Sequence, residues 1–465
     1  MPPSKSALFA AAALALSGCS LAPDYRPPAA PSAPAYKEVT GWQPAGSAVA
    51  PAGQWWQAFG DPTLNALEAR IEAANPNLAA AAARYAQARA LVGEARSDLF
   101  PSVDAQASSG RSRVSANRPL SPGTAETYTA TQIGASLSYE LDLFGRVRNN
   151  IRAAQAGAQA SASDLAGVRL GLQASLASNY FDMRGLDARI VLLRETVQAF
   201  GRASDLTNTR HQGGIASGID VSRADAQLAS ARSELDAVLA DRANLEHAIA
   251  VLVGESPSTF AVPVADIDLA PPAIAAGIPS TLLERRPDIA AAERRMYQAN
   301  ARIGVARAAL FPSVSLGASG GFESTGHSLL SASSGFWALG PIGAALSLFD
   351  GGARRAQVRL TRAEYEEVAA DYRATVLTAF REVEDDLALS RQLALQEQNQ
   401  RAAVRAAERT RDLSLIRYRD GASDYLEVVT AQTAALDAER ALLQVRTRRL
   451  GVQVDLARAL GGSAG

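Results

Sequence analysis

Hydrophobic and polar residues alternate in several short stretches of the chain. The clearest stretch is 131–144, where Ile133, Leu137 and Leu141 belong to an apolar series separated by polar or small residues. A period of two gives a β-strand with one apolar and one polar face. The alternation predicts strands at about 103–114, 130–144, 313–323 and 336–349, with the weakest pattern in the first.

Other parts of the chain lack helix-breaking residues over long distances. Residues 353–420 contain neither Gly nor Pro, and Pro is also missing between Gly123 and Ser256. At about 1.5 Å per residue, 353–420 would form a helix on the order of 100 Å long, which is longer than most helices of globular proteins. Frequent Ala and charges of both signs are typical of coiled coils. We therefore expect an α+β fold with long antiparallel helices.

The chain also repeats itself. Residues 93–103 match 304–314, and both segments contain Leu-Phe-Pro-Ser-Val. Such internal similarity indicates a duplicated structural unit. We expect a first repeat at 61–275 and a second at 276–465. Each would contain a Pro-started helix, two strands, a very long helix, a Gly-containing turn and another helix.

Each repeat has one marked turn between its long helices, at 211–220 and at 418–427. Ser217 precedes Asp220 in the first turn, and Asp424 precedes Glu427 in the second, with the spacing of a capping box. These features predict two helical hairpins. Turn formation explains the residues by itself, and a binding or gating role is an additional hypothesis.

The N-terminus predicts export and a lipid anchor. Lys5 precedes an apolar run that is too short for a spanning helix and ends in Leu-Ser-Gly before Cys19, the only cysteine. This arrangement indicates a signal peptide at 1–18. It resembles a bacterial lipobox, in which the cysteine carries N-acyl and S-diacylglycerol chains. The alternative is an incidental cysteine in an ordinary signal peptide. Residues 19–60 would then be a lipid-anchored extended segment.

The strands have two possible interpretations. They could form a soluble sheet with one wet face, but their lengths also suit the roughly 9–11 tilted residues of a membrane-spanning barrel strand. The export signal favours the barrel. Four strands cannot close one, and unpaired backbone groups in hydrocarbon cost several kcal/mol each, so we expect oligomerisation. Strand counts allow a dimer of about eight strands or a trimer of about twelve.

The sequence gives no indication of an enzyme. The 465-residue chain carries a net charge of -1, which does not suggest a nucleic-acid partner. His211, His247 and His327 lack metal-ligand spacing, and the sequence contains no phosphate-binding loop or nucleophile elbow. We expect no catalytic residues, no metal and no cofactor other than the covalent lipid on Cys19.

A series of short motifs identifies a family. They are Cys19-Ser20-Leu21-Ala22-Pro23-Asp24-Tyr25, Trp55-Trp56, Phe59-Gly60-Asp61-Pro62, the doubled Phe-Pro-Ser-Val, Asp142-Leu143-Phe144-Gly145 and Leu348-Phe349-Asp350-Gly351-Gly352. In this order, within a duplicated chain, they resemble the TolC-like outer-membrane efflux proteins of the OprM/NodT-type lipoprotein branch.

The resemblance implies a homotrimer in which four strands per subunit complete a 12-stranded β-barrel, continued into the periplasm by a coiled-coil barrel of helices. Such a protein is a lipid-anchored outer-membrane channel subunit of a tripartite efflux system. It is a passive exit duct for drugs or other small toxic compounds. Its partners would be outer-membrane lipid, a periplasmic adaptor (membrane fusion) protein and an inner-membrane pump of the resistance-nodulation-division type.

The resemblance also implies roles for individual residues. Asp420 and Asp424 would form a periplasmic gate, although Asp424 is also explained as a helix cap. Glu140 and Asp142 lie on the polar face of the best strand and would face the barrel lumen. The adaptor would contact the turns at Gly213, Gly214, Ile215, Ala216, Ser217, Gly218, Gly421, Ala422 and Ser423.

Two alternative functions remain. One is a periplasmic coiled-coil lipoprotein scaffold in which the alternating segments form a soluble sheet. The other is the same duct serving protein secretion. The sequence leaves open the transported substrate, the identity of the pump and adaptor, and the resting state of the gate.

Overall fold

The computed structural model describes residues 20–28, 35–39, 53–117, 123–265, 270–272, 285–326 and 328–462. The chain separates into two compact units. Unit 1 contains Met1–Ala29, Arg84–Ala162 and Ala291–Arg373, and unit 2 contains Ala30–Ala83, Ser163–Ala290 and Ala374–Gly465. Residues of both sequence repeats contribute to each unit.

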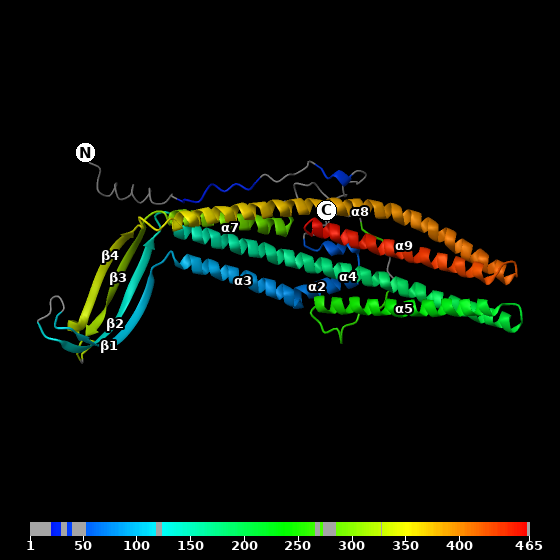
Figure 1. Cartoon of the computed structure of the whole chain (residues 1–465), viewed down its shortest axis with the longest axis horizontal. Helices are drawn as coiled ribbons and strands as arrows, with labels where there is room; N and C mark the ends of the chain where they lie inside the picture. Colours follow the sequence, from blue (N-terminus) through cyan, green and yellow to red (C-terminus); the bar gives the residue numbers. More distant parts are fainter. Residues whose placement is uncertain are drawn as a thin grey trace. The chain divides into compact units, whose positions relative to one another are not determined.

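Unit 1 contains a four-stranded antiparallel sheet in the order β1-β2-β3-β4 (Figure 1). Its strands are β1 Ser102–Val114, β2 Glu126–Leu141, β3 Ser313–Ser324 and β4 Gly335–Ala345. Each repeat supplies one hairpin, and the β2–β3 pairing joins the two hairpins. The four antiparallel strands predicted from the alternating pattern are therefore confirmed.

The strand register aligns the apolar positions of the whole sheet. Leu137 lies opposite Val103 on one side and Ala318 on the other, and Ala318 lies opposite Leu339. Because residues directly opposite one another share a face, one face of the sheet collects the apolar series. Leu339 and its neighbour on that face, Trp337, are 87% and 83% exposed, so this face is uncovered in the single chain.

Two strands end earlier than the alternation suggested. β2 ends at Leu141 rather than at 144, and β4 ends at Ala345 rather than at 349; β2 also begins at Glu126 rather than at 130. The early ends have a common cause. The Asp142 carboxylate accepts hydrogen bonds from the backbone of the helix that follows β2. Asp350 accepts one from Gly352, just before the helix that follows β4, and one from Arg354 within that helix. These carboxylates commit the intervening residues to a turn.

The helices show the duplication directly. They are α2 Pro62–Ala74, α3 Pro76–Ser97, α4 Arg146–Gln212, α5 Gly218–Leu252, α7 Pro287–Ala308, α8 Ala353–Arg419 and α9 Tyr425–Ala459, with short 3-10 helices at Lys37–Val39, Trp55–Phe59 and Ala332–Ser334. α4 and α8 each have 67 residues, and α5 and α9 each have 35. None of the described helices combines the length and hydropathy needed to cross a membrane.

Within unit 2, α4 packs against both α5 and α9. Ile190 and Leu193 of α4 form a buried cluster with Val238 of α5 and Leu436 of α9. Farther along, a Cβ atom placed on Gly185 would lie 2.2 Å from the Thr447 hydroxyl oxygen. Glycine at position 185 therefore lets α4 pack against the Thr447 side chain of α9.

Candidate functional sites at the helical turns, the sheet end and a buried ion-pair network

The turn between α4 and α5 is a Schellman motif. The Ile215 amide donates to the Arg210 carbonyl at 2.8 Å, and Gly214 adopts the left-handed conformation with φ 72°. Ser217 then caps α5 and forms a reciprocal capping box with Asp220. The predicted contact residues Gly213, Gly214, Ile215, Ala216 and Ser217 lie in this turn, and Gly218 begins α5.

The turn between α8 and α9 repeats this geometry. The Ala422 amide donates to the Arg417 carbonyl at 2.8 Å, and Gly421 has φ 76°. Asp424 is the N-cap of α9, where its carboxylate accepts a hydrogen bond from the Glu427 amide at 3.1 Å. The remaining predicted residues of this turn are Asp420, Gly421, Ala422 and Ser423.

The two predicted gate carboxylates therefore differ in their contacts. Asp424 is engaged in the α9 cap, whereas the exposed Asp420 carboxylate has no hydrogen bond or ion pair with any described residue. Capping of α9 explains why an aspartate is at position 424, whereas no contact explains the aspartate at position 420. The gate hypothesis thus has more support at Asp420.

An arginine from the first turn holds the second. The Arg210 guanidinium at the end of α4 donates to the Tyr418 carbonyl at 2.9 Å and to the Arg419 carbonyl at 3.5 Å. It also lies 4.6 Å from the centre of the Tyr418 ring. A cation at the last carbonyls of α8 is favourable because they carry the negative end of the helix dipole. Sequence patterns did not predict this contact, because its partners are 208 residues apart.

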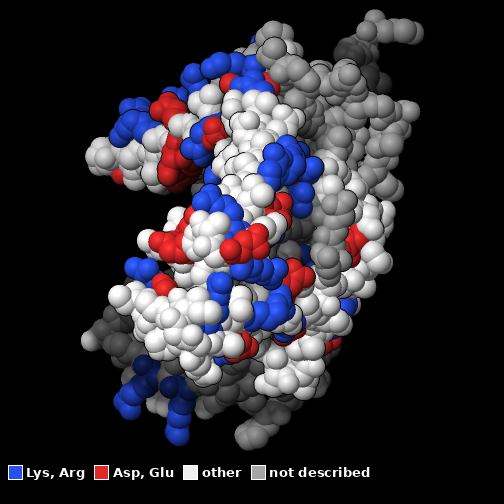
Figure 2. Space-filling model, turned by 90° about the vertical axis from the view of Figure 1, so that its right-hand side faces the viewer, with Lys and Arg blue, Asp and Glu red and all other residues white. Residues whose placement is uncertain are grey.

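The surface around the turns mixes charges and exposed apolar side chains. Figure 2 views the side of the molecule on which the turns lie and shows Lys and Arg interspersed with Asp and Glu around uncharged surface. Ile215 at the first turn is 74% exposed, and Ile219 and Leu426 beside the turns are also exposed. These apolar residues are available to a partner protein.

Glu140 and Asp142, the predicted lumen charges, both contact arginines. Glu140 in β2 receives two hydrogen bonds of 2.8 Å from Arg146, and this pairing raises the pKa of the Arg146 guanidinium. Asp142 lies one residue beyond β2 and pairs with Arg148 at 3.0 Å while capping α4. Both carboxylates therefore help to join the strand to the helix, and their position facing a lumen stays a prediction.

The residues just after the predicted anchor pack against two helices within unit 1. The Ser20 hydroxyl donates to Asn149 at 2.9 Å, the Asn300 amide donates to the Pro23 carbonyl at 2.9 Å, and the rings of Tyr25 and Tyr297 lie 4.9 Å apart. These contacts connect the N-terminal segment to α4 and α7. Cys19 and the signal peptide at 1–18 lie outside the described residues.

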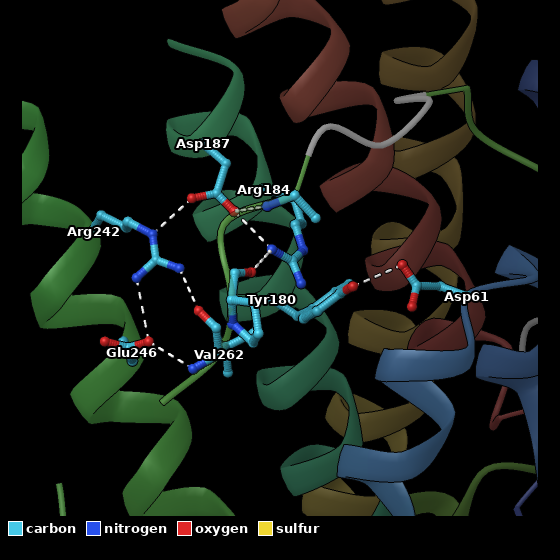
Figure 3. A network of polar contacts seen from close by, with 9 residues as sticks. Asp61, Tyr180, Arg184, Asp187, Arg242, Glu246 and Val262 are labelled. Atoms are coloured by element: carbon cyan, nitrogen blue, oxygen red, sulfur yellow. Dashed lines mark hydrogen bonds and ion pairs between the residues drawn. The ribbon is translucent and has the colours of Figure 1, made fainter. Parts of the chain in front are cut away.

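A buried ion-pair network in unit 2 was not anticipated (Figure 3). Asp187 on α4 lies 2.7 Å from Arg184 and 2.6 Å from Arg242 of α5, and Arg242 also pairs with Glu246. Loss of water opposes the charge on Arg184, but its hydrogen bonds with Tyr180 and Asp187 outweigh that effect and raise its pKa. The network joins α4 to α5 deep in the protein.

The same network holds the chain that follows α5. Arg242 donates to the Val262 carbonyl at 2.6 Å, Glu246 accepts from the Val262 amide at 2.7 Å, and Arg184 donates to the Pro263 carbonyl at 2.8 Å. The backbone of this segment is thus satisfied by buried side chains. Periodicity gives no indication of it, because the partners are distant in sequence.

Metal binding has no support in the described part of the chain. No group of three or more His, Cys, Asp and Glu side chains there is arranged to hold a metal ion.

Comparison with known proteins places the chain among efflux proteins. A family model described as outer membrane efflux protein matches residues 67–255 and 278–462. The antibiotic efflux pump outer membrane protein ArpC and the toluene efflux pump outer membrane protein TtgC, both from Pseudomonas putida, are each 37% identical to it, with 98% of this chain and 94% of each relative covered. The solved structure of the outer-membrane channel OprN superimposes with a TM-score of 0.88 at 31% identity, covering 96% of this chain and 99% of OprN.

Proposed function

The chain belongs to the outer membrane efflux protein family, and on this premise we propose that it works as a homotrimer, the exit duct of a tripartite pump. It is an outer-membrane efflux channel and not an enzyme. The observation that supports a multimer is the open sheet, since β1 and β4 each have one neighbouring strand in the single chain. Three copies of four strands give a closed barrel without unpaired edges.

The proposed cargo is drugs or other small toxic compounds. ArpC and TtgC are named for the export of antibiotics and of toluene, respectively. Their similarity extends over nearly the whole chain, which favours small-molecule export over the scaffold and protein-secretion alternatives. An inner-membrane pump of the resistance-nodulation-division type would supply the energy, and the channel would provide a passive route.

We assign the two helical turns to the periplasmic end of the duct. Residues 213–218 and 421–423 would contact the adaptor protein, for which the exposed Ile215 and Ile219 offer apolar surface. Asp420 would narrow the entrance, and Arg210 would hold the α8 end against α4 until the adaptor engages. Opening of the entrance would then break the contacts between Arg210 and the end of α8.

The anchor proposal rests on the segment next to Cys19. A covalent N-acyl and S-diacylglycerol group on Cys19 would hold the chain to outer-membrane lipid. The contacts of Ser20 and Pro23 with α4 and α7 would fix where the anchor emerges. Mass spectrometry of membrane-extracted protein tests this, and an unmodified Cys19 would refute it.

Gene deletion tests the proposed function. We expect a deletion strain to become more sensitive to antibiotics, dyes or organic solvents, and the full-length gene to restore resistance. The restored protein should migrate as a heat-dissociable trimer and conduct ions in planar bilayers. Unchanged sensitivity to all of these compounds, with a conducting trimer present, would exclude drug export while leaving the channel assignment intact.

A further inference from the structure

A groove in unit 2 has the dimensions of a small-molecule site. It has a volume of about 990 Å³ and lies between α4, α5 and α9, with one residue from α8. This volume is at the upper end of the range for small-molecule pockets, roughly 300–1,000 Å³. None of the predicted tip, gate, anchor or lumen residues lines it.

One part of the groove wall is apolar. Leu186 of α4, Leu389 of α8, and Leu443 and Val452 of α9 all line it. These four side chains come from three helices, so they can contact an apolar body from several directions. Removing apolar surface from water is favourable by about 25 cal/mol per Å².

The groove also contains two carboxylates that lack a full counter-charge. Asp182 of α4 has no hydrogen bond or ion pair with any described residue, and loss of water, followed by the charge of Asp455, raises its pKa. Loss of water and the charge of Glu382 raise the pKa of Asp455, and Arg458, 3.9 Å away, only partly offsets them. Both groups would be stabilised by an added positive charge.

Three arginines line the groove, and two of them are engaged elsewhere. Arg189 and Arg440 both pair with Glu234, and Arg440 also lies 3.3 Å from Asp437. Because Arg189 and Arg440 share Glu234, these two cations are close to each other, and loss of water and the charge of Arg189 lower the pKa of Arg440. The third, Arg448, is exposed. None of the three pairs with Asp182 or Asp455, so these two carboxylates remain available to a ligand.

We propose that this groove binds an organic cation with an apolar body. The cationic centre would lie against Asp182 and Asp455, and the body would contact Leu186, Leu443 and Val452. The apolar wall selects an organic cation over a small inorganic one, because a hydrated ion makes no use of it. The proposal concerns binding to the channel itself and does not depend on which compounds the pump exports.

Tetraphenylphosphonium is a suitable probe, because it joins a positive centre to four apolar rings. Isothermal titration of the full-length protein in detergent should show saturable binding. The substitutions Asp182→Asn and Asp455→Asn together should weaken binding about tenfold or more. Gln444→Lys, which adds a positive charge at an exposed groove position, should also weaken binding while both carboxylates remain.

Two controls separate this site from general attraction to an acidic surface. Asp236→Asn with Asp412→Asn makes the same change in charge at exposed positions outside the groove and should leave affinity unchanged. Tetraphenylborate, an anion of similar size and shape, should not lose affinity when Asp182 and Asp455 are replaced by Asn, because these substitutions remove negative charge. Equal affinity of the native and groove variants for tetraphenylphosphonium, or an equal loss in the control variant, would overturn the proposal. Trimer migration of each variant verifies its folding.

Discussion

Asp420 and Asp424 lie in the same turn, but their carboxylates have different surroundings. In a symmetric trimer, each would be repeated three times around the axis and could form a ring of like charge. Because Asp424 already caps α9 and Asp420 has no described partner, the free carboxylate is the better candidate for an electrostatic constriction.

Asp420→Ala should therefore raise single-channel conductance in planar bilayers and reduce cation selectivity. Asp424→Ala should destabilise the start of α9 by about 1 kcal/mol, the usual effect of losing a cap, and raise conductance if its charge also faces the entrance. Unchanged conductance and selectivity in the double variant would reject a gate made of these residues.

Glu68 on α2 is a buried acid that the channel function does not explain. It is fully buried, and neither carboxylate oxygen has a hydrogen-bond partner. Loss of water, followed by the charge of Glu72, raises the pKa of Glu68 to about 9 from an ordinary value of 4.5. Between these values the folded chain holds a proton that the unfolded chain releases, so the free energy of unfolding falls as pH rises.

Glu68→Gln should remove the cost of ionising a buried acid, and the free energy of unfolding should then depend less on pH. We expect the variant to be more stable than the native protein at neutral and alkaline pH, by up to about 3 kcal/mol at pH 7, and to be similar to it near pH 4. Thermal unfolding between about pH 4 and pH 9 measures the difference. If the native protein does not lose stability relative to Glu68→Gln as the pH rises over this range, Glu68 does not have the raised pKa assigned to it.

At the scale of helices, the network around Asp187 stabilises the α4–α5 hairpin. Removing one member of a buried ion pair leaves its partner charged and uncompensated, which costs about 3–5 kcal/mol. Asp187→Asn should approach this cost because Arg184 loses its described carboxylate partner and Arg242 keeps only Glu246. Asp385→Asn is the matched control, since it breaks an exposed pair with Arg381 at 3.9 Å and should cost less than about 1 kcal/mol. Equal melting temperatures for the two variants would refute the argument.

The Arg210 contact joins the end of the α4–α5 hairpin to the end of the α8–α9 hairpin. Arg210→Ala should free the C-terminal carbonyls of α8 and raise single-channel conductance severalfold, because the turns can then separate. Arg223→Ala provides a control near the first turn, where the arginine is exposed and lies 3.9 Å from Asp220. If both variants conduct equally, Arg210 does not hold the entrance.

Sequence patterns predicted the helices and strands better than the side-chain contacts that join them. Alternation is a local pattern, and duplication is found by comparing the sequence with itself; the four strands and long repeated helices that they predicted are confirmed. The strand ends differed because capping by Asp142 and Asp350 replaces the alternating pattern with a turn. The Asp187 network and the Arg210 contact join residues from different helices, and hydrophobic periodicity does not show which distant charges meet.

At the scale of the whole molecule, the proposed trimer would place the uncovered apolar face of the sheet against the membrane. Trp337 and Leu339 of β4 lie on the same face as Ala135 and Leu137 of β2, whereas Ala338 lies on the other face. In a closed barrel of three subunits, one face meets lipid and the other lines the lumen. Each chain therefore has the alternating apolar and polar faces of a barrel wall, but its four strands are too few to close a barrel.

This arrangement predicts opposite effects for neighbouring substitutions. Leu339→Asp places a charge on the lipid face and should cost up to about 2–4 kcal/mol if the residue lies near the middle of the bilayer, with a reduced fraction of heat-dissociable trimer in the outer membrane. Ala338→Asp places the same charge on the lumen face and should leave trimer formation intact while changing ion selectivity. Electrophoresis of unheated membrane extracts and planar-bilayer recordings compare the two. Equal loss of trimer in both variants would mean that the two faces of β4 are not divided between lipid and water, and the barrel assignment of this sheet would fail.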